Sequence, residues 1–277
     1  MKKWILGILA LSITVPSFAQ ELPQPSPTST VQQRIGLTDI TVNYSRPSAN
    51  GRTIFGDLVP YDQLWRTGAN SSTKISFSNA VIIEGKTVDA GEYALFTIPN
   101  KESWTLILSK QTSLWGASGY DKNEDVLRFG IVPEKSDFDE TFSIGFKNLS
   151  KDGGTMAIEW SNVAISFPIE VDSEGQSAKN VSQALSTANR AYRNAAEFYS
   201  GTGDHNKAMA TIDLALELDG TSWYTYWVKA EIMQAAGKTK EAKKQGAVAL
   251  SKGQAYYDSM GQPFNYRAGI EKDMKKW

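Results

Sequence analysis

The stretch EYALFTIPNKESWTLILS, residues 92–109, shows the pattern that decides the fold of the first half of the chain. Two runs rich in apolar, β-branched and aromatic side chains, residues 92–98 and 104–109, are separated by a polar segment that begins with Pro99 and Asn100. Short runs of this composition bounded by turn residues are typical of β-strands. The stretch therefore predicts two short strands separated by a turn.

The same strand pattern continues on both sides of this stretch, over residues 34–171. Ile40, Val42 and Tyr44 alternate with polar residues, which is the period of a strand with one buried face. Further strand-like runs lie at residues 74–78, 80–84, 126–132, 141–146, 155–160 and 162–169. About nine short strands with no helical pattern between them predict an all-β domain that forms an antiparallel β-sandwich or a flattened barrel.

The first 33 residues read as processing and linker sequence. Lys2 and Lys3 precede an apolar run at residues 4–15, and Ser17-Phe18-Ala19 has the small residues of a cleavage site. This pattern predicts a signal peptide over residues 1–19, cleavage near Ala19 and export to the periplasm or the medium. Residues 20–33 are rich in Pro, Ser, Thr and Gln and predict a flexible leader.

After about residue 174 the hydrophobic period becomes 3.6 and alanine becomes frequent. The segment at residues 203–208 recurs in similar form at 237–242, a spacing of 34 residues, with small residues in register on both sides. This period resembles the tetratricopeptide repeat. It predicts two helical hairpins, at 189–222 and 223–256, within a helical domain over residues 174–277. A helical extension from about 177 would precede them, and a final helix near 263–275 would follow. Together, the two halves predict an α+β multidomain protein whose helical repeats dock a protein partner.

Composition excludes several classes of site. The chain has no cysteine and one histidine, His205, so thiol chemistry, histidine-dependent triads and Cys/His metal sites are ruled out. Residues 20–172 carry 13 Lys and Arg against 19 Asp and Glu, and residues 173–277 carry 14 against 11. Neither half is basic enough for nucleic acid. No metal, cofactor or catalytic residue is predicted, and the signal segment is too short to span a bilayer.

Residues 46–73 form the candidate site. Three arginines lie in this segment, Arg46, Arg52 and Arg66, and it contains no lysine. Arginine offers a planar donor fork that suits a carboxylate or phosphate. The segment also supplies flat aromatic walls and an orienting amide, from Tyr61, Trp65 and Asn70. The pattern predicts a recess for a small anion or an acidic sugar. In the alternative, the arginines pair with acidic residues such as Asp57 and Asp62 and with backbone carbonyls to hold a long loop in place.

Two further groups of residues are candidate sites. Trp115 lies in a loop and could stack on a sugar ring, whereas Trp104 begins a strand and is predicted to be core. Asp121, Glu124 and Asp125 share one loop and could bind Ca²⁺ or act as an acid/base pair. The alternative for this acidic loop is a solvated turn.

Several long strings carry a family resemblance over residues 34–170. They are YSRP at 44–47, GRTIFG at 51–56, LVPY at 58–61, WRTGAN at 65–70 and AGEYALFTIP at 90–99. Shorter matches follow, at Trp104-Thr105, Trp115-Gly116, Tyr120 and DVLR at 125–128. With these strings the chain resembles the bacterial domain of unknown function number 2911. The resemblance implies an exported protein, in some members followed by tetratricopeptide-like helices, and it carries no catalytic residues.

The leading functional hypothesis is an exported, non-catalytic binding or assembly protein. Its β-domain would bind a small anionic or glycan ligand, and its helical repeats would dock a protein. The alternatives are an exported carbohydrate-active hydrolase, which needs two carboxylates facing a cleft, and a purely structural module.

Overall fold

The structure, a computed structural model, describes residues 22–277. The predicted signal peptide and its cleavage site lie outside the described residues. The chain divides into two compact units, a β-unit that ends at Asp172 and a helical unit over Ser173–Trp277. Antiparallel sheets in the first and helices in the second confirm the α+β arrangement predicted from the two periods.

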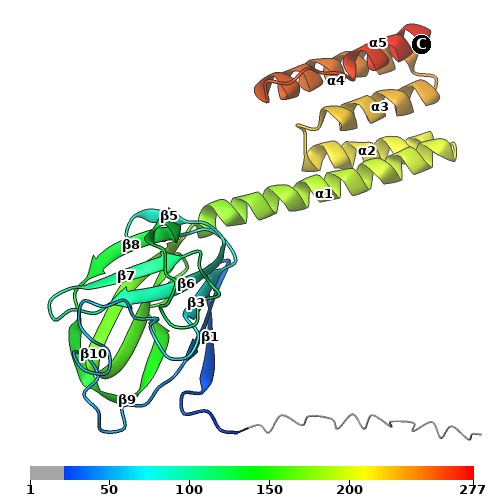
Figure 1. The fold of residues 1–277 in the computed structure, drawn as a ribbon. Helices are drawn as coiled ribbons and strands as arrows, with labels where there is room; N and C mark the ends of the chain where they lie inside the picture. The colour runs from blue at the N-terminus through cyan, green and yellow to red at the C-terminus, as the bar shows by residue number, and fades with distance from the viewer. Residues whose placement is uncertain (1–21) are drawn as a thin grey trace, which may run out of the picture. The chain divides into compact units, whose positions relative to one another are not determined.

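Ten strands form two antiparallel sheets in the β-unit (Figure 1). One sheet has the order β1-β2-β3-β6-β7-β8, and the other has the order β5-β4-β10-β9. The strands are β1 (Thr28–Ile35), β2 (Thr38–Ser45), β3 (Thr73–Phe77), β4 (Val81–Ile83), β5 (Lys86–Val88), β6 (Gly91–Ile98), β7 (Trp104–Ser109), β8 (Asp125–Ile131), β9 (Glu134–Lys147) and β10 (Gly153–Val171).

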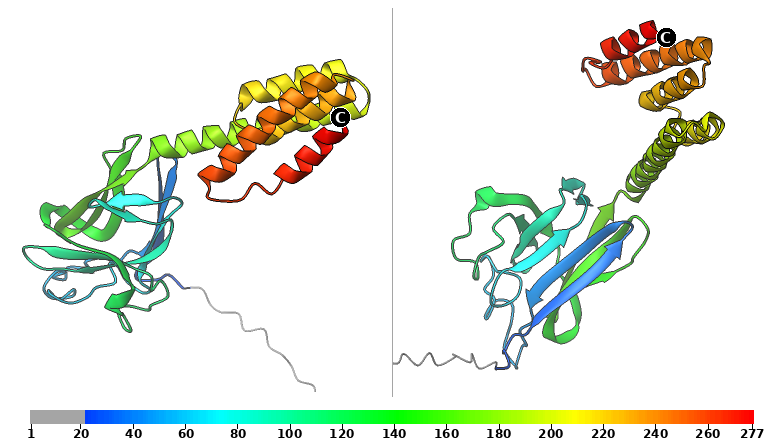
Figure 2. Two further views of the ribbon diagram at one scale, coloured as in Figure 1. Left: turned by 90° about the horizontal axis from the view of Figure 1, so that it is seen from above. Right: turned by 90° about the vertical axis from the view of Figure 1, so that its right-hand side faces the viewer.

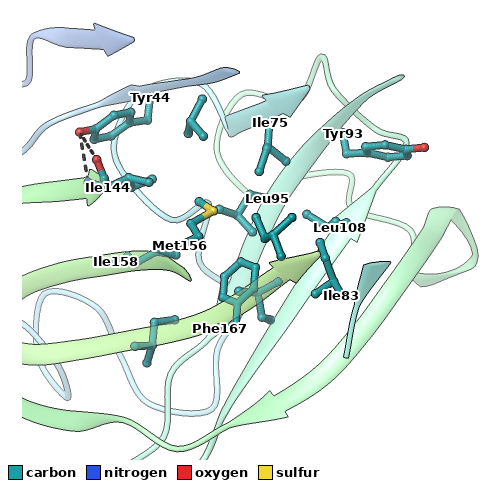
Figure 3. Packing of buried hydrophobic residues seen from close by; sticks show 14 of the residues in the cluster. Tyr44, Ile75, Ile83, Tyr93, Leu95, Leu108, Ile144, Met156, Ile158 and Phe167 are labelled. Carbon is teal, nitrogen blue, oxygen red and sulfur yellow. Dashed lines mark hydrogen bonds between the residues drawn. The ribbon is translucent and has the colours of Figure 1, made fainter. Parts of the chain in front are cut away.

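One hydrophobic core contains side chains from both sheets (Figure 3). Every second residue of β2, starting from Ile40, is buried, as the period of two predicts. The hydroxyl of Tyr44 on β2 accepts a hydrogen bond from the amide of Ile144 on β9 at 3.1 Å. This bond links the two sheets directly, because β2 and β9 belong to different sheets.

The structure corrects the predicted flexible leader at residues 20–33. Residues 28–33 lie in β1, which pairs antiparallel with β2 over its whole length. Val31 packs against the core, and backbone hydrogen bonds to β2 satisfy the strand. A polar edge strand is compatible with solvent on its outer side, so its composition alone resembles a linker.

Two strand boundaries also differ from the prediction. The predicted runs at 155–160 and 162–169 are one strand, β10, with irregular register on either side of Ser161, which has a φ of 55°. Its partner β9 begins at Glu134 rather than at residue 141. A local bulge lets a long strand bend without ending, and such a bulge resembles a turn in the sequence.

The helical unit consists of five helices that follow one another through space in sequence order (Figures 1 and 2). They are α1 (Ser173–Gly201), α2 (His205–Leu218), α3 (Trp223–Ala235), α4 (Thr239–Ser259) and α5 (Arg267–Lys276). The predicted extension and the first helix of the first hairpin form one continuous helix, α1. No helix in the described range is long and apolar enough to cross a membrane.

Small residues and polar caps explain how these helices pack. Alanines stand fully buried where the helices meet: Ala196, Ala208, Ala215, Ala230, Ala242 and Ala249. Asp204 caps α2 by accepting from the amide of Lys207 at 3.1 Å. Buried Asn189 of α1 donates to the carbonyl of Ala215 at 2.7 Å and accepts from the hydroxyl of Thr225 at 2.9 Å. Its amide therefore ties α1 to both α2 and α3.

Candidate functional site

The candidate site is built on the long connection between β2 and β3, which ends beside β6. Trp65 and Thr97 of β6 exchange two backbone hydrogen bonds, at 2.7 and 2.9 Å. The hydroxyl of Thr73 donates to the carbonyl of Thr67 at 2.5 Å. Thr67 and Asn70 adopt positive φ angles of 53° and 60°. These contacts fix the connection on the sheet, so its side chains are displayed by a rigid support.

Trp65 is part of the core. It is 9% exposed, and its ring stacks on Trp160 with a centroid distance of 6.0 Å and an interplanar angle of 20°. Phe55, Trp104 and Phe142 surround it edge-on, which confirms Trp104 as a core residue. The indole nitrogen donates to the carbonyl of Gly68 at 3.0 Å. Trp65 is therefore both a packing residue and one wall of the cavity described below.

Two of the three arginines hold backbone carbonyls. Nε of Arg46 donates to the carbonyl of Phe142 at 3.0 Å. Arg52 donates from Nε to the carbonyl of Ala49 at 2.9 Å and from Nη2 to that of Ser48 at 2.7 Å. These bonds match the loop-holding alternative for Arg46 and Arg52. Within residues 22–277, no ion pair joins Asp57 or Asp62 to an arginine.

Arg66 differs from the other two arginines. It is half-buried, and its Nε atom is buried without a hydrogen-bond partner. Its guanidinium lies against the turn at Gly116, where φ is 74° and an added Cβ would stand 3.0 Å from Nη1 of Arg66. The side chain is therefore enclosed, but one of its donors is unsatisfied.

Arg52, Trp65 and Arg66 line one cavity of about 300 Å³. Apolar side chains form much of the remaining wall, and no carboxylate from the described part of the chain lines it. The other lining residues are Ser26, Pro47, Leu58, Val59, Pro60, Gln63, Leu64, Gly68, Ala69 and Trp160. The cavity is therefore a recess of mixed polar and apolar lining, with two cationic side chains at its wall.

Asn70 and Trp115 line a second, larger hollow of about 700 Å³. Asn70 donates from Nδ2 to the carbonyl of Ser26 and to the hydroxyl of Ser45, both at 3.2 Å. The indole of Trp115 is 71% exposed. The remaining lining residues are Gln24, Ser26, Thr28, Ser29, Thr30, Asn43, Tyr44, Ser45, Ser71, Ser72, Lys74 and Glu92. This second hollow will be called the groove.

The structure thus divides the predicted site residues among three places. Arg52, Trp65 and Arg66 meet at the cavity, while Asn70 and Trp115 lie on the groove. Arg46 and Tyr61 line neither of them. The ring of Tyr61 lies against Gly56, where an added Cβ would be 2.6 Å from Cε2, and the Nζ of Lys101 stands 5.9 Å from the ring centroid.

Sequence reasoning missed the residues that β1 and its preceding segment contribute. Ser26 lines both the cavity and the groove, and Thr28 and Thr30 line the groove. These residues fell within the predicted leader. Its polar composition hides the weak alternation of exposed and half-buried side chains that starts at Thr28. Only the pairing with β2 distinguishes this strand from a linker.

In the acidic loop, the carboxylates of Asp121 and Asp125 make contacts within the fold. Asp121 accepts from the amide of Asn123 at 2.9 Å and caps a short 3₁₀ turn (Lys122–Glu124). Asp125 pairs with Arg128 at 2.9 Å and accepts from the hydroxyl of Tyr120 at 2.7 Å. Burial and this hydrogen bond raise the pKa of Tyr120 to about 12. Among residues 22–277, no group of three or more acidic or histidine side chains could hold a metal ion.

Comparison with known families agrees with the resemblance seen in the sequence. The model of the family described as "Protein of unknown function (DUF2911)" matches residues 26–169, so the chain belongs to this family. The match begins at Ser26 and therefore includes β1. No curated protein and no solved structure matches the chain significantly.

Proposed function

We propose that this member of the DUF2911 family is an exported, non-catalytic binding protein whose β-unit holds a small anionic or acidic-sugar ligand in the cavity at Arg66. The observation that carries the proposal is that Arg66 lines this cavity while its buried Nε has no hydrogen-bond partner. Arg46 and Arg52 act as supports, since Nε of Arg46 donates to a carbonyl of β9 and Nε and Nη2 of Arg52 donate to carbonyls of its own loop.

The energetics of the unpartnered Nε of Arg66 favour an anionic ligand. A buried donor without an acceptor costs about 1–3 kcal/mol, and more when the group is charged. A carboxylate or phosphate can accept two parallel hydrogen bonds from one guanidinium. The apolar wall of Trp65, Val59 and Pro60 would exclude water from that contact and strengthen it. A cavity of about 300 Å³ is at the lower limit of ligand sites, which suits one small molecule or one sugar.

A carbohydrate hydrolase is less well supported at this place. Such an enzyme needs two carboxyl groups about 5–10 Å apart on either side of the substrate. No Asp or Glu of the described residues lines the cavity, and on the groove only Glu92 does. Glu92 is moreover engaged in an ion pair with Lys74 at 3.3 Å.

The proposal extends to both units of the chain. Two sheets that share one core support a β-sandwich as the scaffold of the site. Helical hairpins with buried alanines at a 34-residue spacing support tetratricopeptide-like repeats that would serve as a protein-docking arm. The signal-like pattern at residues 1–19 supports export.

A thermal-shift screen on residues 20–277 tests the binding proposal. The panel contains inorganic phosphate, citrate, galacturonic acid, N-acetylneuraminic acid and the neutral sugars glucose and lactose. A true ligand at 100 times its Kd should stabilise the β-unit by about 2.7 kcal/mol. We expect stabilisation by one or more of the anions and none by the neutral sugars. Stabilisation by neutral sugars alone, or release of reducing ends from an oligosaccharide, would contradict the proposal.

A further inference from the structure

Trp115 is the most exposed large hydrophobic side chain of the described residues. Its backbone is nevertheless fixed. Trp115 forms an isolated β-bridge with Ser71, and the next residue, Gly116, donates to the carbonyl of Asn70 at 3.3 Å. A large aromatic ring held in water by a rigid backbone offers a flat apolar face to a ligand.

The floor of the groove is the outer face of the six-stranded sheet. Thr30, Asn43 and Lys74 stand side by side on neighbouring strands β1, β2 and β3. The hydroxyl of Thr30 donates to the side-chain oxygen of Asn43 at 2.7 Å, and Lys74 pairs with Glu92. The floor therefore presents hydroxyl, amide, ammonium and carboxylate groups in one row, which can both donate to and accept from ligand hydroxyls.

The loop after β7 explains why the groove has a wall. Phe96 and Ile107 lie on the same outer face, and Leu114 and Tyr120 of this loop cover them. The loop thus packs on one half of the face and leaves the half over β1, β2 and β3 open. Trp115 directly follows Leu114, so its ring stands at the boundary between the covered and the open half.

A buried hydroxyl adds a second unpartnered group. Ser72 lines the groove, is 3% exposed, and its Oγ has no hydrogen-bond partner. A buried hydroxyl without a partner is unfavourable unless a ligand or solvent group completes it. The cavity and the groove are therefore each lined by one residue whose buried polar atom has no partner, Arg66 and Ser72 respectively.

The cavity and the groove adjoin each other. Ser26 lines both, and Asn70 holds Ser26 in place through its carbonyl. Gly116, which follows Trp115, lies against the guanidinium of Arg66. A ligand longer than one sugar can therefore reach from Arg66 past Ser26 to Trp115.

We infer that the cavity and the groove together form one site for an acidic oligosaccharide, an inference that rests on the proposed function of the Arg66 cavity. The anionic group of one sugar binds Arg66, and a neighbouring sugar ring stacks on Trp115 while its hydroxyls meet the polar floor. A peptide fits the groove less well, since Tyr44 and Trp115 are its only aromatic or aliphatic lining side chains among the described residues. Peptide recognition uses such apolar pockets for alternate side chains.

Isothermal titration of residues 20–277 tests this inference with matched probes. The acidic oligosaccharides are 3′-sialyllactose and trigalacturonate. Their one-ring counterparts are N-acetylneuraminic acid and galacturonic acid, and lactose is the neutral control. An acidic tripeptide, triglutamate, is the peptide probe. The proteins are wild type, Trp115→Ala, Arg66→Lys and Phe138→Ala. Phe138 is an exposed aromatic of the same unit that lines neither the cavity nor the groove, so its variant is the matched control.

We expect at least one acidic oligosaccharide to bind wild type about tenfold tighter than its one-ring counterpart, which corresponds to one favourable aromatic contact. Trp115→Ala should abolish this gain and leave the one-ring affinity unchanged. Arg66→Lys should weaken both probes about equally, and Phe138→Ala should weaken neither.

The outcomes separate this inference from the proposed function. If one-ring acids bind through Arg66 but oligosaccharides bind no tighter, or Trp115→Ala has no effect, the inference is overturned and the anion site stands. If no acidic probe binds, or Arg66→Lys changes nothing, the proposed function fails and the inference fails with it. Binding of triglutamate that depends on Trp115, without any oligosaccharide binding, would also overturn the inference.

Discussion

The two units of the chain differ in the side chains that occupy the closest contacts of their cores. The β-unit buries large side chains such as Trp160, Phe96 and Phe142, which touch residues distant in the sequence. The helical unit buries alanines, with Ala196, Ala208 and Ala215 in one cluster, and lets helices approach closely. The β-unit should therefore lose stability when a large buried side chain is removed. The helical unit should lose stability when a larger side chain is placed between its helices.

This difference explains where a ligand site can form. A core of interlocked aromatic rings supports the long connection that carries Trp65 and Arg66, so the cavity keeps its shape. The helical unit has no comparable large core cluster in the described range, and its helices are held by contacts with their neighbours. Such a unit suits contact over an extended surface rather than a small enclosed site.

Removing volume from the β-unit is the strongest way to test the comparison. Trp160 is 2% exposed, stacks on Trp65 and lines the cavity. Trp160→Ala should destabilise the β-unit by about 3–5 kcal/mol, because a large buried cavity would remain. Denaturant unfolding followed by near-ultraviolet circular dichroism measures the effect. The control Phe138→Ala, at a 56% exposed position, should change stability by less than about 0.5 kcal/mol.

Adding volume to the helical unit tests the other side of the comparison. A Cβ at Gly253 would stand 2.3 Å from the ring of Phe264, which is packed against Tyr257 and Trp223. Gly253→Ala should therefore destabilise the unit by about 1–3 kcal/mol through overpacking. A Cβ at Gly269 would meet nothing within 4 Å, so Gly269→Ala should instead stabilise by up to about 1 kcal/mol. Thermal melts followed by helical ellipticity measure both variants. If Gly253→Ala and Gly269→Ala stabilise the unit equally, the close packing at Gly253 is contradicted.

The next prediction concerns the pH dependence of the helical unit. Burial, with the nearby carboxylates of Glu197 and Asp273, raises the pKa of Glu231 from 4.5 to about 7, and a hydrogen bond from Trp227 offsets part of this. Glu231, Asp273 and Lys276 line one shallow hollow of the helical unit, and Lys276 pairs with Asp273. Because the folded pKa is raised, the unfolded chain loses this proton first as pH rises, so stability should fall between pH 4.5 and 7.

Glu231→Gln removes this dependence, so the variant should be as stable as wild type at pH 4 and more stable at pH 8. Thermal melts of the helical unit at both pH values measure the difference. A variant that is less stable at pH 8 would mean that ionised Glu231 makes a favourable contact.

The sequence predicted the parts of the fold that depend on local pattern. Alternation in residues 38–45 placed β2, because a strand with one buried face has a fixed period. The short apolar runs at 92–98 and 104–109 placed β6 and β7, which are buried on both faces over most of their length. The strand β1 was missed, since its polar edge composition is that of a linker and only pairing with β2 defines it.

The candidate site was predicted as a set of residues but not as a geometry. Arg46, Arg52 and Arg66 are chemically identical in the sequence, yet backbone carbonyls satisfy Arg46 and Arg52 and leave Nε of Arg66 without a partner. The acceptors of Arg52 are local, but the surroundings of Arg46 and Arg66 depend on β9 and on the turn at Gly116, both distant along the chain. Long-range contacts of this kind carry no local signal.

The central claim is that Arg66 binds an anion while Arg46 and Arg52 hold the loop. The direct test measures melting temperature and affinity for galacturonic acid and inorganic phosphate in wild type, Arg66→Lys, Arg52→Lys and Arg46→Lys. Lysine keeps the charge but loses the planar fork. Arg66→Lys should weaken anion binding by about 1–3 kcal/mol and leave the melting temperature nearly unchanged. Arg46→Lys and Arg52→Lys should lower the melting temperature instead, because they lose hydrogen bonds to carbonyls. A destabilised Arg66→Lys protein, with no anion response in any of the four proteins, would contradict the account.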